Sequence, residues 1–161
     1  ENIYLFLRSD FEYLTANKQI INFFNEVLMS RLSERIENFK KAYNIFFDAV
    51  QAYNKDENSV LIQMALVQSF EICIELAWKV LKDYLQQKGI NSLLPKDVIK
   101  EAFSTEIIKN GQVWIDMINA RNSTSHEYNI DKVNVIIKNI SSNYYEELQL
   151  FNKEIEKFNE K

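Results

Sequence analysis

The sequence predicts an all-α protein, an up-and-down helical bundle with three long helices and shorter ones between them. Three observations indicate this class. The 161 residues include only two glycines and one proline, whereas a β-sandwich or barrel of this size needs turns rich in both. No G-x-G or G-x-x-x-x-G-K motif is present, which argues against a nucleotide fold with a glycine-rich phosphate loop. Apolar residues recur every three or four positions over three long segments.

The clearest helical period lies in residues 31–53, where one apolar stripe predicts a long helix. The stripe consists of Leu32, Ile36, Phe39, Tyr43, Phe46, Val50 and Tyr53. The polar run of residues 54–59 ends the pattern and offers helix caps. A second long helix is predicted from Val60 to about Lys88, with Gly89 as its stop. Its expected inward residues are Leu61, Met64, Val67, Phe70, Ile74, Ala77, Trp78, Leu81 and Leu85.

Two shorter helices and a third long one are predicted beyond Gly89. Pro95 suits the first turn of a short helix that ends at Phe103. A further helix is expected to begin near Gly111 and to run into the polar residues 122–125. The last helix is expected to start near residue 129 or 131. Its stripe is Val133, Ile137, Ile140, Tyr144, Leu148, Phe151, Ile155 and Phe158.

Residues 1–28 are interpreted as an N-terminal extension, and residues 29–161 as the bundle domain, for which Met29 is a credible start. The longest apolar run, residues 3–7, is too short to span a bilayer, and no signal-peptide pattern is visible. We therefore expect a soluble cytoplasmic protein with no membrane partner.

Charge and cysteine content exclude several classes of site. With 23 acidic residues against 19 basic ones, the chain lacks the basic excess of proteins that hold nucleic acid through broad electrostatics. Any RNA contact must therefore be a local site. The single cysteine, Cys73, excludes an intrachain disulfide and a cysteine-rich zinc site. Cys73, Trp78 and Trp114 are expected in the core.

The one histidine, His126, follows Arg121 by five residues and precedes Tyr128 by two. A lone histidine near a helix end is most often a cap or a surface group. Three details favour chemistry here. Residues 122–125 are four small polar residues in a row, typical of a helix end. Arg121 follows an apolar run that fixes it to rigid structure, and histidine transfers protons near neutral pH.

Arginine, histidine and tyrosine suit phosphodiester chemistry without a metal. The histidine can deprotonate a 2′-hydroxyl or protonate a leaving 5′-oxygen, and the arginine can bind phosphate. Because each chain has one histidine, a two-fold dimer would be needed to supply both an acid and a base. Residues five apart on an unbroken helix differ by about 140°, so convergence of Arg121 and His126 needs a break or two chains.

Glu71, Glu75 and Lys79 are spaced by four and share one helix face. They form either a solvated stripe with a Glu75–Lys79 ion pair or a pair of carboxylates beside Arg121. A metal site is not expected, because no third ligand has matching spacing.

Four segments in order carry a family resemblance: residues 68–85, 95–103 and 114–117, and Arg121-Asn122 with Ser125-His126-Glu127-Tyr128. They resemble the HEPN proteins encoded beside minimal nucleotidyltransferases, the HepT toxins, long described as nucleotidyltransferase substrate-binding proteins. The last segment fits the family pattern Arg-x4-His-x-Tyr. The resemblance covers about residues 30–158. Ser69 stands where many relatives carry arginine, which leaves one cationic group fewer near the second helix.

The resemblance implies a metal-independent ribonuclease toxin, without cofactor, that forms a homodimer around the motif. Its antitoxin partner would be a minimal nucleotidyltransferase that adds AMP to Tyr128. By position, Arg121 and His126 would be catalytic and RNA the substrate. Asn122, Glu71 and Glu75 are candidates for the cleft. A non-catalytic nucleotide- or substrate-binding subunit and a pure interaction protein stay as alternatives, as does a Tyr128 that only packs against the last helix.

Overall fold

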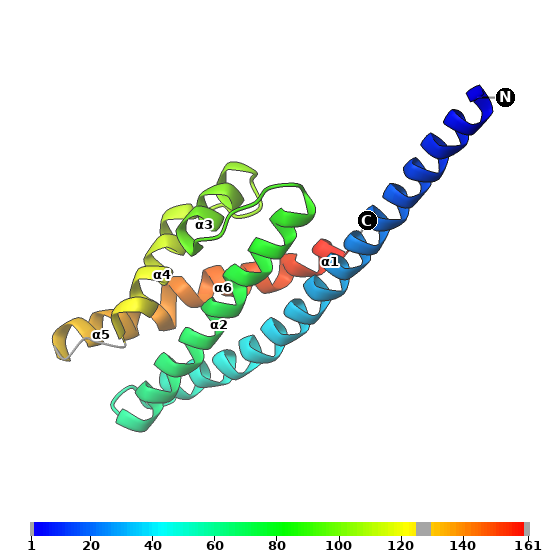
Figure 1. Ribbon diagram of the computed structural model, residues 1–161. Helices are drawn as coiled ribbons and strands as arrows, with labels where there is room; N and C mark the ends of the chain where they lie inside the picture. Colours follow the sequence, from blue (N-terminus) through cyan, green and yellow to red (C-terminus); the bar gives the residue numbers. More distant parts are fainter. Residues whose placement is uncertain (1, 125–129, 160–161) are drawn as a thin grey trace.

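The computed structural model describes the backbone of residues 2–124 and 130–159 and the side chains of residues 17–123 and 133–158. Every regular element within these residues is a helix (Figure 1). The elements are α1 (Asn2–Lys55), α2 (Val60–Gln87), α3 (Pro95–Ser104), α4 (Gly111–Thr124), α5 (Ile130–Asn139), the π-helix η1 (Ile140–Tyr144), α6 (Tyr145–Glu154) and the 3-10 helix η2 (Ile155–Asn159). The all-α prediction is confirmed.

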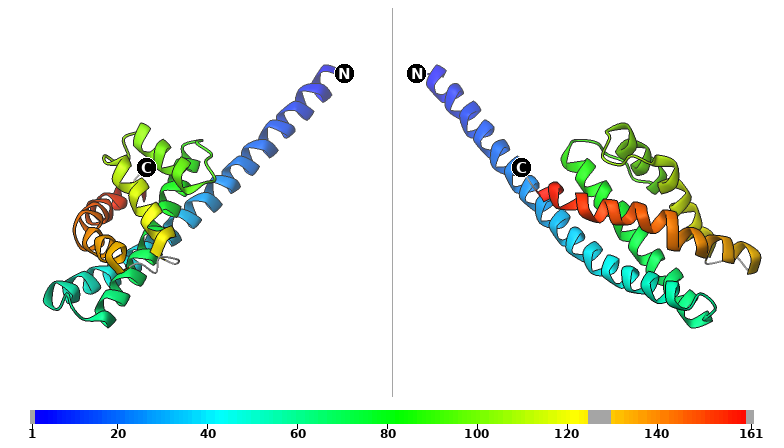
Figure 2. Two further views of the ribbon diagram at one scale, coloured as in Figure 1. Left: turned by 90° about the vertical axis from the view of Figure 1, so that its left-hand side faces the viewer. Right: turned by 180° about the vertical axis from the view of Figure 1, so that it is seen from behind.

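The helices form an up-and-down bundle around α2. This helix runs back alongside α1, while α3 and α4 lie beyond it, and the segment from α5 to η2 completes the bundle (Figure 1 and Figure 2). Residues 130–159 are helical throughout and form the third long helix that the sequence predicts. The expected architecture of three long helices with shorter ones is therefore present.

The predicted stripe of α1 is buried along its whole length and forms one wall of the core. At the centre, Phe151 of α6 packs edge-on against Phe39 of α1 and Trp114 of α4, with ring centroids 5.2 and 5.1 Å apart. Complete burial of a large apolar side chain stabilises a fold by about 1.5–3 kcal/mol. This contact between three helices therefore helps to fix the position of α4, which carries Arg121.

The prediction for the first turns of α2 is wrong. Leu61 and Met64, expected inward, are 79% and 64% exposed. The buried residues of α2 begin at Leu66, so the first turns reach beyond the part of the bundle that covers the helix. Past Leu66 the helix is buried on two sides, and Cys73 and Val80 are buried although the predicted stripe omits them.

A buried carboxylate joins α2 to α1. Asp83 of α2 is 1% exposed and lies between two arginines of α1. Arg31 Nη2 is 3.0 Å from Asp83 Oδ1, and Arg35 forms an ion pair with Oδ2. Gln87 adds a hydrogen bond from its side-chain amide to the carbonyl of Leu28, at 3.2 Å. These polar contacts secure α1 at the point where it leaves the bundle.

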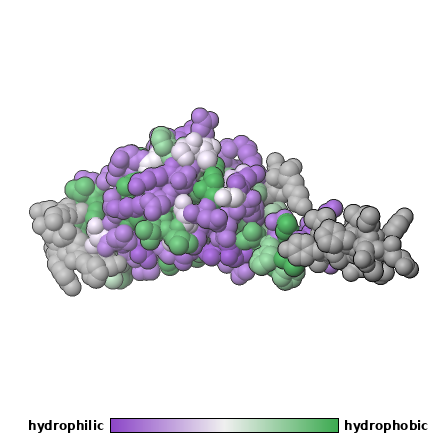
Figure 3. Space-filling model, turned by 45° about the horizontal axis from the view of Figure 1, so that its top comes forward, coloured by the Kyte–Doolittle hydropathy of each residue, from purple (hydrophilic) through white to green (hydrophobic). Residues whose placement is uncertain are grey.

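The first half of α1 projects away from the other helices (Figure 1). The helix is continuous across residues 28 and 29, so the interpretation of residues 1–28 as an extension stays a prediction. Along residues 20–27 five large apolar side chains are exposed, at Ile20, Ile21, Phe23, Phe24 and Val27. Figure 3 shows hydrophobic patches on a mainly hydrophilic face, one of them beside this projecting part.

The end of α2 and the start of α3 lie at the glycine and the proline that the sequence indicated. Gly89 has φ +82°, the left-handed conformation that glycine adopts at helix ends. The N–H of Ile90 donates to the carbonyl of Leu85 at 3.0 Å, which completes a Schellman motif. Pro95 occupies the first turn of α3 as predicted. The bounds of α3 and α4 thus agree with the sequence within one or two residues.

The π-helix η1 in the third long helix is not predicted by the sequence. The apolar stripe remains inward on both sides of it, since Ile137, Ile140, Tyr144 and Leu148 are all buried. Tyr144 stacks on Phe70 of α2, with centroids 5.5 Å apart. The wider turn therefore keeps the last helix in contact with α2.

By length and composition α2 is also apolar enough to cross a membrane, although its sequence contains no long continuous apolar run. Its buried residues belong to the same core cluster as those of α1, α4 and α6. The core accounts for part of the apolar composition of this helix, and the exposed residues Leu61, Met64 and Ile72 for another part.

Candidate functional site

The structure brings Arg121 and Glu75 together. Arg121 lies in the last turn of α4, and its Nη2 is 3.5 Å from Oε2 of Glu75 on α2. Glu75 Oε1 also pairs with Lys79 Nζ at 2.8 Å, one turn further along α2. Both interpretations of the glutamate stripe thus hold in part, because Glu75 binds Lys79 and lies beside Arg121. The Arg121 side chain is 43% exposed, so it remains accessible to an anionic ligand.

Glu75 has a third donor in Trp78, whose indole Nε1 donates to Oε2 at 3.0 Å. Burial alone would raise the pKa of the Glu75 carboxyl. The hydrogen bonds from Lys79 and Trp78 and the charges of Lys79 and Arg121 outweigh burial, so the pKa lies below its usual value of 4.5. Glu75 is therefore ionised at neutral pH. Trp78 is 8% exposed, in agreement with the expected core position.

Asn122 is the second described neighbour of Arg121. Its side-chain Oδ1 accepts a hydrogen bond from Arg121 Nη1 at 3.1 Å. The guanidinium is thus held between Asn122 on its own helix and Glu75 on α2. This arrangement fixes its direction, as is required of a group that binds a phosphate in one orientation.

Glu71 lies one turn before Glu75 on the same face of α2 and is partly buried. Ser69, where the family resemblance leads to the expectation of an arginine, is 6% exposed, and its hydroxyl donates to the carbonyl of Leu66 at 3.0 Å. The serine is therefore satisfied within α2.

His126 and Tyr128 lie outside the described residues. Their catalytic and regulatory roles stay predictions from the motif, as does their convergence with Arg121. The described part of α4 continues through Thr124, so it carries the chain to within two residues of His126.

Within the described residues, no three histidine, cysteine or acidic side chains are grouped so that they could hold a metal ion. Cys73 is fully buried, and burial raises the pKa of its thiol. A thiol in such a place is unreactive.

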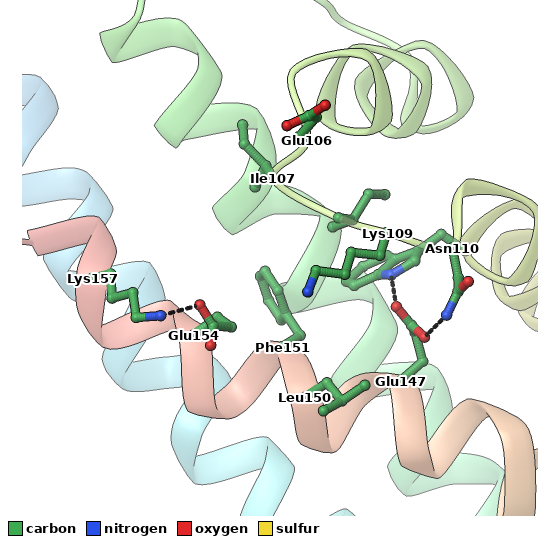
Figure 4. A pocket seen from close by; sticks show the side chains of 11 residues that line it. Glu106, Ile107, Lys109, Asn110, Glu147, Leu150, Phe151, Glu154 and Lys157 are labelled. Carbon is green, nitrogen blue, oxygen red and sulfur yellow. Dashed lines mark hydrogen bonds and ion pairs between the residues drawn. The ribbon is translucent and has the colours of Figure 1, made fainter.

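Sequence reasoning missed a buried carboxylate at the opposite end of α4. Glu147 of α6 is 7% exposed and accepts hydrogen bonds from Asn110 Nδ2 at 2.7 Å and from Trp114 Nε1 at 3.3 Å (Figure 4). It borders a cavity of about 330 Å³ that also contains Lys109. The signal was its place in the stripe, three residues after Tyr144. Trp114 lines this cavity and precedes Arg121 by seven residues of α4, about 10 Å at 1.5 Å per residue.

Comparisons with known proteins agree with the predicted resemblance. The family model described as "Nucleotidyltransferase substrate binding protein like" matches residues 34–157. The probable ribonuclease HepT of Haemophilus influenzae is 33% identical over 79 residues, which are 46% of this chain and 54% of that protein. The chain thus spans about half the length of this curated relative.

A solved structure shares the fold. It is that of the tri-AMPylated Shewanella oneidensis HEPN toxin in complex with MNT antitoxin, with a TM-score of 0.62 and 13% sequence identity. The alignment covers 78% of this chain and 96% of that chain. Together these matches confirm the resemblance that the four sequence segments indicated.

Proposed function

Because the chain belongs to the nucleotidyltransferase substrate binding protein-like family, matched over residues 34–157, we propose that it is a ribonuclease toxin of a toxin–antitoxin module. The names of the two relatives, a probable ribonuclease HepT and a HEPN toxin bound to an MNT antitoxin, support this proposal. The observation that carries it is the Arg121 guanidinium, held by Glu75 and Asn122 yet 43% exposed, five residues before the one histidine.

The proposed reaction needs no metal. His126 takes the proton of an RNA 2′-hydroxyl, and the 2′-oxygen attacks the adjacent phosphorus. The bond from phosphorus to the 5′-oxygen breaks, and the leaving oxygen receives a proton from an imidazolium. Arg121 binds the phosphate and stabilises the additional negative charge of the transition state. Glu75 positions Arg121 and does not touch the reacting atoms.

A homodimer would supply the base and the acid from two copies of His126. The exposed face of the first half of α2 is the surface that we assign to this contact. Leu61, Met64 and Ile72 are 79%, 64% and 47% exposed on the helix face that continues into Glu75. Exposed apolar residues on one helix face are typical of an interface. Because the same face would meet itself in a two-fold dimer, the two Arg121 side chains would approach the same cleft.

The partner that we propose is a minimal nucleotidyltransferase that adds AMP to Tyr128. An AMP group places a phosphate charge and a base beside His126, where the RNA phosphate would bind. Repulsion between like charges and simple blockage would both oppose substrate binding. We further propose a soluble, cytoplasmic location, where both the RNA and the partner are present.

A non-catalytic subunit that binds a nucleotide or other substrate for the nucleotidyltransferase is the second candidate. The family description favours it, and so does the cavity of about 330 Å³ beside Glu147, which combines Phe151 with the lysine Lys109. This function would use the far end of α4 and would not require Arg121 or His126.

RNA degradation distinguishes the two functions. Purified protein is incubated with total RNA in the presence of EDTA, alongside His126→Ala, and the same chains are expressed with and without a nucleotidyltransferase partner. A ribonuclease toxin cleaves RNA, slows growth when expressed alone, and loses both properties with the histidine. Intact RNA together with normal growth would favour the binding subunit.

A further inference from the structure

A groove runs between α3 and α4. It consists of two adjoining hollows of about 500 and 350 Å³, which share Lys96 and Lys100 of α3 as lining residues. One hollow reaches Phe103 and Gly111 near the start of α4, and the other reaches Asn122 at its end. At 1.5 Å per residue of α4, the groove is about 15 Å long.

The groove leads to the candidate active site. Asn122 lines its end and also accepts the hydrogen bond from Arg121 Nη1, at 3.1 Å. A strand lying in the groove would therefore reach the Arg121 guanidinium without leaving the protein surface.

The charges of the groove favour a polyanion. Lys96 is exposed and forms no ion pair within the described residues, whereas Lys100 lies 3.5 Å from Asp97. Among the residues that line the groove, two lysines and one aspartate leave a balance of one positive charge, on a chain whose net charge is −4. A local positive site is what an acidic protein needs to bind nucleic acid.

An aromatic ring stands at the other end of the groove. Phe103 is 52% exposed, whereas most other aromatic side chains of the bundle, such as Phe39, Phe46 and Phe70, are buried. Its ring packs directly on Gly111, where an added Cβ would come within 2.9 Å of the ring carbon Cγ. The glycine thus lets the ring pack against the start of α4 while about half of its surface stays exposed. Exposed aromatic rings beside positive charges are platforms on which single-stranded bases stack.

We propose that the groove between α3 and α4 is a track for single-stranded RNA, an inference that rests on the ribonuclease function proposed above. Lys96 and Lys100 contact backbone phosphates, and Phe103 stacks on a base. Asn122 marks the end at which the strand enters the cleft. At the 3.4 Å spacing of stacked nucleotides, the groove holds on the order of four of them.

The test measures binding and cleavage separately. Fluorescence anisotropy gives the Kd of a labelled single-stranded RNA for variants that also carry His126→Ala, so that the RNA stays intact. Cleavage kinetics use the same groove variants with His126 present. The control is Lys41→Ala, which removes a lysine that is also exposed but lies on α1, outside the groove. Circular dichroism verifies that each variant is folded.

The lysine and phenylalanine substitutions are expected to raise the Kd for RNA, and the aspartate substitution is expected to lower it. Lys96→Ala raises Kd and KM up to about fivefold and reduces the dependence of log Kd on log salt by about 0.7. Phe103→Ala raises Kd roughly 5- to 150-fold. Asp97→Asn lowers Kd, because it removes a negative charge and releases Lys100. A gain in affinity cannot result from misfolding. In each variant kcat changes less than KM.

The outcomes separate this proposal from the function on which it rests. If the lysine and phenylalanine variants bind RNA with the same Kd as the Lys41→Ala control, the proposed RNA track is wrong. If these variants also cleave RNA normally, the ribonuclease function is unaffected. RNA that is bound through Lys96 and Phe103 but never cut by the unmutated chain would refute the ribonuclease function alone. Unchanged RNA binding with weakened binding of a nucleotidyltransferase would assign the lysines to that partner and overturn the track.

Discussion

Arg121 at the end of α4 reaches Glu75 on α2, with 3.5 Å between Nη2 and Oε2. Glu75 is held in turn by Lys79 and Trp78 on its own helix. The carboxylate therefore connects the core residue Trp78 to a half-exposed guanidinium. This connection gives the candidate site a fixed arginine, and several predictions about the site depend on it.

Acid is expected to weaken the contact of α2 with α4. The pKa of Glu75 in the folded chain lies below 4.5, so its charge stabilises the fold above that pH, and the contribution is lost as pH falls through the folded pKa. Thermal unfolding of the unmutated chain and of Glu75→Gln from pH 7 to 3 checks this. The difference in Tm stays constant down to about pH 5 and narrows below 4.5. A difference that already narrows between pH 7 and 6 would assign the effect to another group.

Removal of either motif residue abolishes cleavage without unfolding the bundle. His126→Ala lowers kcat/KM by roughly 10²–10⁴-fold, the usual effect of losing one acid–base group. Arg121→Ala lowers it by roughly 10²–10³-fold, the usual effect of losing one group that stabilises the charge of the transition state. Far-ultraviolet circular dichroism of both variants matches the unmutated chain. EDTA leaves the activity unchanged. If EDTA stopped cleavage and a divalent ion restored it, Glu71 and Glu75 would have to be reinterpreted as metal ligands.

The chain is expected to form a two-fold dimer through the exposed face of α2 that carries Leu61, Met64 and Ile72. Light scattering at micromolar concentration gives twice the mass of one chain. Ile72→Glu places a charge in the interface and yields a monomer that has lost RNA cleavage. Leu150→Glu changes a residue of similar exposure, 54% against 47%, on α6 and leaves the dimer intact. A monomer with full activity would contradict the requirement for two histidines.

Tyr128 is the expected site of AMP addition. Incubation with a cognate nucleotidyltransferase and ATP adds one or more AMP masses to the peptide that contains Tyr128, and cleavage is lost. Tyr128→Phe retains cleavage and takes up no AMP at this position. Complete inhibition of a chain whose Tyr128 stays unmodified would show that the partner acts by binding alone, and would leave Tyr128 with a packing role.

Glu147 is predicted to stabilise the fold and not to take part in cleavage. Glu147→Ala leaves the Trp114 indole N–H and the Asn110 amide without their acceptor, at a cost of about 1–3 kcal/mol in the free energy of unfolding. Urea unfolding followed by circular dichroism measures it. The neighbouring Glu146→Ala removes an exposed carboxylate and changes this free energy little. Equal effects of the two substitutions would contradict the structural role.

The helices could be predicted because the spacing of apolar residues and the residue types at helix ends are local properties of the sequence. Residues 32–53 and 137–158 carry one unbroken stripe each, and both stripes are buried as predicted. The same reasoning fails at Leu61, because periodicity shows which residues share a face but not where the neighbouring helices stop. Periodicity also does not predict the π-helix at residues 140–144, because the apolar stripe continues across the wider turn.

Buried charges depend on partners far away in the chain. Asp83 is buried because Arg31 and Arg35 of α1 meet it, and Glu147 because Trp114 of α4 does. Nothing near Asp83 in the sequence indicates this, and near Glu147 only its place in the apolar stripe does. The pairing of Arg121 with Glu75 could be anticipated only in outline, from a shared helix face and a family resemblance. The position of His126 stays a prediction for the same reason, since it depends on residues that follow α4.

Each of the two tryptophans donates its indole N–H to a glutamate, Trp78 to Glu75 and Trp114 to Glu147. The chain therefore contains two tryptophan fluorophores in different places, one beside Glu75 and one beside Glu147. Emission from Trp78 responds to the electric field around Arg121, while Trp114, with no exposed surface, responds to the integrity of the interior. Ligand capture and unfolding thus produce distinct optical signals from one unlabelled molecule.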